Sequence, residues 1–173
     1  MIPDPLHPAM VHFPIALASL VPMFAVLAAI AIRAGWISAR AWLVVVLMQA
    51  MLAGTAWVAH ETGENEEEKV EKVVDERFIE EHEEAADLLL RTAAVTFVIS
   101  LFGVAGGSIG TIGRVVSILA MSGVALASIP AGKLGGELVY HHGAASAYVK
   151  KGEAAPAASP QEAPPQEAPP QEE

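Results

Sequence analysis

Four long apolar stretches dominate the chain, and short polar segments separate them. They cover residues 12–32, 41–59, 85–105 and 112–131, and each is close to the roughly 20 residues that an α-helix needs to cross the hydrocarbon core of a bilayer. Asp87 and Arg91 are the exceptional charges inside them, and their i, i+4 spacing lets them pair on one helix. The pattern predicts an all-α fold, an integral membrane four-helix bundle with up-down-up-down topology.

The two most polar segments predict different structures. Residues 61–84 are rich in glutamate, but Val70, Val74 and Phe78 recur every four positions and lead to His82. We therefore expect an extended acidic helical segment before the third span, with His82 on its buried side. Residues 151–173 repeat Pro, Gln, Glu and Ala without large apolar side chains, which predicts a disordered tail after a transmembrane domain of residues 1–150.

Composition restricts the chemistry that such a bundle can perform. The formal net charge of -10 disfavours nucleic acid as a partner, and membrane lipids are the expected surroundings. The chain has no cysteine, so a redox or metal centre would have to use histidine and oxygen ligands. The order of serine, histidine and acidic residues along the chain does not indicate a hydrolase. We do not expect the chain to be an enzyme by itself. Assembly into a homo-oligomer stays open.

The positions of basic residues predict an orientation in the membrane. Arg33 and Arg40 follow the first span and Arg114 follows the third, so these two loops are expected on the cytoplasmic side, although other basic residues fall on the opposite side. This interpretation places both termini on the outer, periplasmic side of a bacterial inner membrane.

The histidines form the most informative polar pattern. An up-down-up-down chain brings all six to one side of the membrane: His7, His12, His60, His82, His141 and His142. His7 and His12 are five residues apart and point in different directions on a regular helix, so we expect ligation across helices. Haem b, held by one imidazole from each of two helices, would satisfy this arrangement. The first choice of ligands is His82 with His7 or His12, while His142 would serve a second pair or the same pocket. Six histidines allow one or two haems.

Two alternatives stay open at this point. Histidines with neighbouring carboxylates, such as Glu61 beside His60 or Glu81 and Glu83 beside His82, could form a non-haem zinc, iron or copper site. The histidines could instead be interfacial polar residues that cap helices, in a non-catalytic anchor or scaffold subunit of a larger redox or transport complex. The glutamates of residues 61–84 are then either a solvated helix face or a docking surface for a basic partner, such as a soluble electron carrier.

Motifs near both ends of the chain are distinctive. The first contains His7-Pro8 and His12-Phe13-Pro14-Ile15-Ala16-Leu17, and the last is Gly135-Gly136-Glu137-Leu138-Val139-Tyr140-His141-His142-Gly143, with Thr62-Gly63 and Glu81-His82-Glu83 between them. With these motifs, residues 5–145 resemble bacterial membrane proteins catalogued as domain of unknown function 2231.

The resemblance implies a four-helix membrane domain and a set of motif residues. Its motif histidines would be His7, His12, His82 and His142, which are also the candidate metal ligands, with Tyr140 beside them. His60 and His141 complete the expected cofactor-binding set. Because such proteins are sometimes joined to c-type cytochrome domains, the resemblance favours haem. We therefore expect electron transfer between the membrane and a soluble or membrane partner at the acidic outer face.

Overall fold

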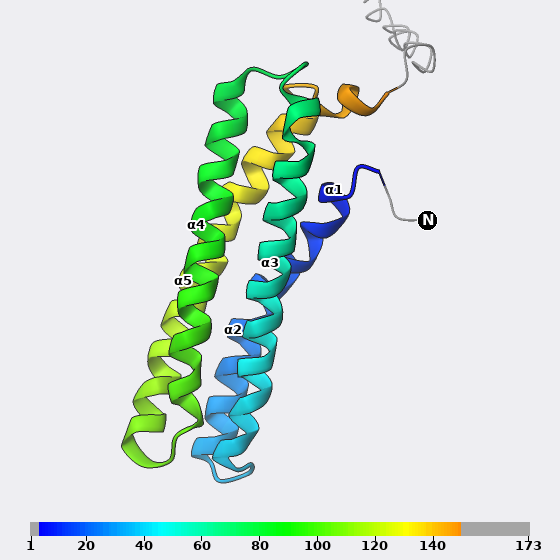
Figure 1. Cartoon of the computed structure of the whole chain (residues 1–173). Coiled ribbons are helices and arrows are strands. Elements are labelled where there is room, and N and C mark those ends of the chain that lie inside the picture. Colours follow the sequence, from blue (N-terminus) through cyan, green and yellow to red (C-terminus); the bar gives the residue numbers. More distant parts are fainter. Residues whose placement is uncertain (1–3, 150–173) are drawn as a thin grey trace, which may run out of the picture.

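The fold is a bundle of long helices. The computed structural model describes residues 4–149, and the regular elements in this range are all helical. Four long helices run side by side in alternating directions (Figure 1): α2 (His12–Arg33), α3 (Trp42–Val70), α4 (Glu76–Leu101) and α5 (Gly107–Tyr140). Shorter elements are α1 (His7–Met10) and the 3-10 helices η1 (Ala39–Ala41), η2 (Phe102–Val104) and η3 (Ala144–Tyr148). The predicted all-α fold is confirmed, while the predicted tail of residues 151–173 lies outside the described residues.

The outer surface of the bundle has the character of a membrane protein. Four helices are long and apolar enough to cross a membrane. Large aliphatic side chains such as Leu27, Leu47 and Leu119 are well exposed on the outside of α2, α3 and α5. A continuous apolar exterior of this kind is stable when lipid surrounds it, which explains why the bundle does not bury these residues.

The acidic segment is helical, but a turn divides it. α3 continues to Val70, and α4 begins at Glu76 after Asp75, whose side chain accepts a hydrogen bond from the backbone N–H of Arg77 at 3.2 Å. The predicted acidic helical segment before the third span is therefore confirmed, because α4 begins at Glu76, but Val70 belongs to α3 and does not share a helix with Phe78. Val74 lies in the turn and packs with Ile79, Leu138 and Ala144, so the four-residue spacing reflects a small cluster around the turn.

The opposite end of the bundle is closed by a tight α4–α5 connection. Arg114 is 8% exposed, and its Nε donates to the carbonyl of Gly103 at 2.8 Å. The Trp42 indole donates to the carbonyl of Ser100 at 3.0 Å and packs on Gly103, where a Cβ would overlap the ring. Arg114 thus donates hydrogen bonds to carbonyl groups just after the end of α4. The connection can be this compact because residue 103 is a glycine.

Candidate cofactor cavity at the histidine end

A cavity of about 400 Å³ lies where α1, α3, α4, α5 and η3 meet. Three imidazoles border it, together with four carboxylates, a phenol and an apolar wall. The polar lining residues are His7, His60, His82, Glu64, Glu66, Glu67, Glu83 and Tyr148, and the larger apolar ones are Val70, Ile79, Leu138 and Val139. Its size is in the range of pockets that hold a small organic ligand.

His7 and His82 face the cavity as a pair from different helices. Their ring centroids are 6.1 Å apart, with 77° between the ring planes. Each ring packs on a glycine of another helix: a Cβ on Gly63 would lie 3.2 Å from Cε1 of His7, and a Cβ on Gly135 would lie 3.0 Å from Cε1 of His82. These two glycines therefore make room for the two imidazoles.

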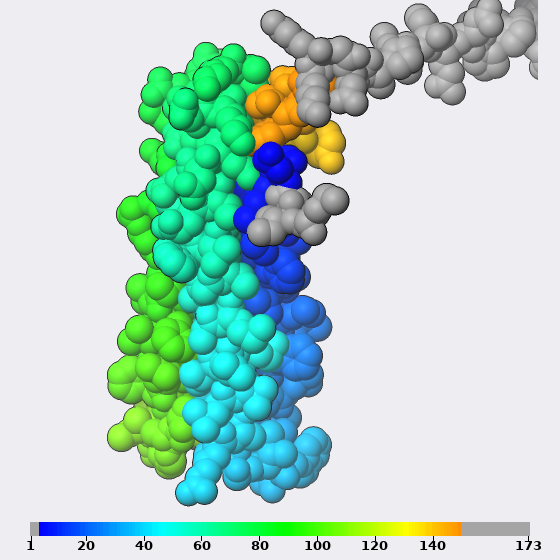
Figure 2. All heavy atoms as spheres, turned by 45° about the vertical axis from the view of Figure 1, so that its right-hand side comes forward, coloured from blue at the N-terminus to red at the C-terminus, as the bar shows by residue number. Residues whose placement is uncertain are grey.

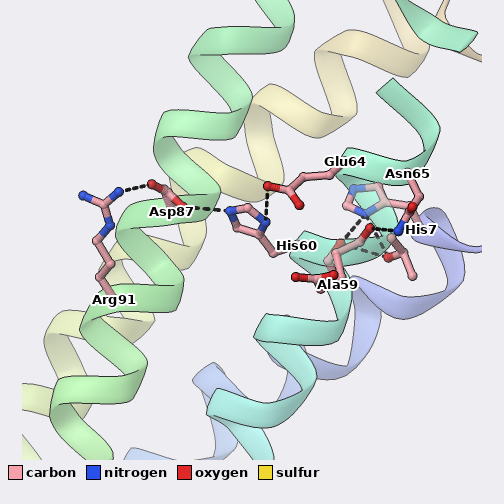
Figure 3. Close-up of polar contacts among 9 residues, drawn as sticks. His7, Ala59, His60, Glu64, Asn65, Asp87 and Arg91 are labelled. Atoms are coloured by element: carbon pink, nitrogen blue, oxygen red, sulfur yellow. Dashed lines mark hydrogen bonds and ion pairs between the residues drawn. The ribbon is translucent and has the colours of Figure 1, made fainter. Parts of the chain in front are cut away.

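One face of α3 holds the His7 ring. The Nδ1 of His7 lies 2.8 Å from the carbonyl oxygen of Ala59, so Nδ1 carries the proton and donates it (Figure 3). In the neutral imidazole this assignment leaves the lone pair on Nε2. Metal-bound histidines commonly donate their other ring N–H to a backbone carbonyl in this way. His7 is thus fixed in the tautomer that suits a ligand.

His82 has an unsatisfied nitrogen. Its Nδ1 is buried and has no hydrogen-bond partner among the described residues. A buried polar atom without a partner costs about 1–3 kcal/mol. Only a ligand that bonded to Nδ1 itself would remove this cost, and Nδ1 has almost no exposed surface in this structure.

The third imidazole, His60, belongs to a network of charged groups. Its Nε2 lies 2.8 Å from Oδ1 of Asp87, and its Nδ1 lies 3.5 Å from Oε1 of Glu64 (Figure 3). Asp87 also pairs with Arg91, which confirms the predicted i, i+4 ion pair. Because carboxylates approach both nitrogens, His60 links α3 to α4 and is less suited than His7 or His82 to bind a metal.

Other residues of the predicted site lie outside the cavity lining. The His142 ring stacks on Phe78, with centroids 3.7 Å apart and 19° between the planes. His12 and His141 are exposed, and Tyr140 is 86% exposed. The structure therefore brings together His7, His60 and His82 and leaves these four outside.

The cavity does not contain a ready non-haem metal site. Within residues 4–149, no group of three or more histidine, aspartate or glutamate side chains is placed to hold one metal ion. Structural zinc sites use four protein ligands and catalytic ones use three. The arrangement offers a pair of imidazoles instead.

The motifs that supply this pair also establish the family. Residues 3–147 match the family described as predicted membrane protein, domain of unknown function 2231 (DUF2231). The chain belongs to this family. No curated protein and no solved structure matches it. DUF2231 membership confirms the resemblance found in the sequence and identifies a membrane protein, while the chemistry has to be inferred from the cavity.

Glu66 and Tyr148 are two of the residues of this DUF2231 cavity that were not predicted from the sequence, and Glu64 and Glu67 are others. Oε2 of Glu66 accepts a hydrogen bond from the Tyr148 hydroxyl at 3.1 Å. Glu66 follows Ala59, Thr62 and Gly63 at i+7, i+4 and i+3, so its place on the face of α3 that holds His7 could have been found from helical periodicity. Tyr148 lies beyond the last motif, and no sequence signal points to it.

The Tyr148 phenol should be difficult to ionise. Burial, together with the hydrogen bond and negative charge of Glu66 and the charge of Asp4, raises the pKa of Tyr148 to about 12. The protonated phenol is favoured in the folded state, so its contribution to stability is present below the ordinary pKa near 10 and is lost as the pH rises to about 12.

The chain has two tyrosines. In a Tyr140→Phe variant, the phenolate absorbance should therefore rise near pH 12, and additional Glu66→Gln should move this rise to lower pH; an unchanged midpoint would contradict the Glu66 contact.

Proposed function

We propose that this DUF2231 protein is a membrane-embedded b-type cytochrome-like protein that transfers electrons. His7 and His82 are the residues that would hold one haem. The observation that carries the proposal is their placement on separate helices with ring centroids 6.1 Å apart at one cavity. A b-type haem needs imidazole ligands for its iron, and these two rings at one cavity would supply them.

The surroundings of the two rings support a bis-histidine site. The His7 tautomer leaves Nε2 as an acceptor, and the buried Nδ1 of His82 has no hydrogen-bond partner within residues 4–149. Ile79, Leu138 and Val139 provide an apolar wall. Bound haem would supply a one-electron redox centre, and burial and the His7–Ala59 hydrogen bond are the means by which this chain would tune its potential. A pair of imidazoles satisfies haem, whereas zinc would need further ligands.

The charge around the cavity supports an external partner. Glu64, Glu67 and Glu83 border the cavity, and negative charge of this kind steers a basic soluble electron carrier towards it. We propose that the cavity lies on the periplasmic side of a bacterial inner membrane, because Arg33 and Arg40 lie in the loop at the opposite end of the bundle, although Lys69, Lys72 and Arg77 lie at the cavity end. In this cysteine-free chain, an impermeant maleimide applied to intact cells should label Ser146→Cys and spare Ser38→Cys; the reverse result would invert the orientation.

The test of the proposal is the absorption spectrum of the detergent-purified protein, oxidised and then reduced with dithionite. We expect sharp reduced bands and about one iron per chain, as one bis-histidine haem requires. A colourless, iron-free protein that stays so after haem is added would overturn the haem proposal.

A scaffold subunit with a non-haem metal ion at His7 and His82 is the second candidate. The carboxylates of Glu64, Glu67 and Glu83 favour it, since they could complete the ligand set after a rearrangement of side chains. Metal analysis of the same sample separates the two candidates, because this one requires a stoichiometric metal ion without the haem spectrum.

A further inference from the structure

The position of His7 depends on a contact far away in the sequence. His7 is the first residue of α1, which has four residues and begins after Leu6, whose aliphatic side chain cannot accept a hydrogen bond. Val11 is also helical and joins α1 to α2, so His7 stands in the first turn of a long helix. The N–H groups at the start of a helix have no partners within it, so those of Leu6 and His7 depend on contacts with the rest of the bundle.

Glu66 provides these contacts from α3. Its Oε1 accepts hydrogen bonds from the backbone N–H groups of Leu6, at 2.6 Å, and His7, at 3.1 Å. Its Oε2 accepts from the hydroxyl of Tyr148 in η3. One carboxylate on α3 thus joins the start of α1, which lies 60 residues before it, to η3, which lies 82 residues after it.

The same contact keeps η3 against the cavity. Ala144, Ala145 and Tyr148 of η3 line the cavity together with His7 and His82. In the space-filling view, the start of the chain (blue) and η3 (orange) lie together against α3 (Figure 2). Lys69 adds to this closure, because its Nζ lies 3.7 Å from Oδ1 of Asp4 and 5.5 Å from the centre of the Tyr148 ring.

We propose that Glu66 is the positioning residue of this site, which fixes His7 at the cavity and holds η3 closed beside it. The ligation of haem by the positioned His7 rests on the proposed function, but the fixing of His7 does not. Glu66 bonds to the backbone of His7 and to Tyr148 and not to either imidazole, so its effect on the position of His7 is exerted through these contacts.

Histidine labelling by diethyl pyrocarbonate, located by mass spectrometry on haem-free protein, tests this role. Glu66→Ala should raise the rate of His7 modification by a factor of about 2 to 30, the change in an opening equilibrium that loss of a capping side chain produces. Glu66→Gln should remain close to wild type, because its amide oxygen can accept both backbone N–H groups. Tyr148→Phe should raise the rate by less than Glu66→Ala, since both backbone bonds remain.

His141 serves as the internal reference, because it is exposed and does not line the cavity. Its modification rate, together with the helical circular dichroism, should be equal in all variants; a His7 rate that rises against this reference supports the proposal. An unchanged His7 rate in Glu66→Ala overturns it, and so does an equal rise in Glu66→Gln and Glu66→Ala.

The labelling experiment separates the positioning role of Glu66 from the haem proposal. If the wild type never binds haem but His7 responds as expected, the positioning role stands and the haem proposal fails. If haem binds and His7 does not respond, the positioning role fails by itself. In haem-loaded protein, Glu66→Ala should also lower haem retention, and Glu66→Gln should restore it.

Discussion

Replacing His82 by alanine is expected to abolish the reduced-minus-oxidised haem spectrum of the purified protein. The substitution removes one of the two imidazoles whose ring centroids are 6.1 Å apart at the cavity, and the third cavity imidazole, His60, is held by Asp87 and Glu64. A single remaining ligand would hold haem far more weakly. The measurement is the haem content per chain after purification and after reconstitution with added haem.

His12→Ala and His141→Ala are the matched controls for this experiment. Both remove an exposed imidazole at the same end of the bundle and outside the cavity lining. We expect each to keep the wild-type spectrum, while His7→Ala should behave like His82→Ala. A full spectrum in His82→Ala would rule out this ligand pair, and a lost spectrum in His12→Ala would show that His12 and not His7 is the partner.

The second large effect is expected on stability, from Gly113→Ala. In the closely packed α4–α5 connection, a Cβ on Gly113 would lie 2.7 Å from the carbonyl carbon of Phe102 and 2.8 Å from the backbone nitrogen of Gly103. Backbone atoms cannot rotate away as a side chain can, so α5 must move away from η2. Overpacking typically costs about 1–3 kcal/mol, and we expect the free energy of unfolding to fall by at least this amount. Denaturation in detergent, followed by circular dichroism, measures the change.

Gly123→Ala is the control on the same helix. A Cβ at this position of α5 would meet nothing within 4 Å. Alanine is a better helix former than glycine by up to about 1 kcal/mol, so Gly123→Ala should be neutral or slightly stabilising. Equal destabilisation by both substitutions would show that the close backbone contact at Gly113 is not the cause.

The connection between α3 and α4 shows how far periodicity alone can be trusted. Val70, Val74 and Phe78 recur every four residues, yet Val70 lies in α3 and Phe78 lies in α4, which begins at Glu76. Side chains spaced by four residues can pack together around a turn as well as along one helix. Periodicity therefore predicted which residues cluster but not the path of the chain between them.

The sequence by itself determined the four spans, the gathering of histidines at one end and the Asp87–Arg91 pair. Each of these follows from local rules: lipid requires long apolar helices, alternating helices bring their ends together, and residues four apart on a helix are neighbours. The sequence could not determine which imidazoles share a cavity, because that depends on the rotation of each helix about its axis.

The tertiary structure decided this rotation through contacts between distant residues. The carbonyl of Ala59 orients the His7 ring, Glu66 holds the backbone of His7 and the hydroxyl of Tyr148, and Gly135 gives space to His82. The same contacts favour His7 over His12 and leave His142 stacked on Phe78. Contacts across 52 to 82 residues leave little trace in local sequence patterns, which is why the structure was needed to assemble the site.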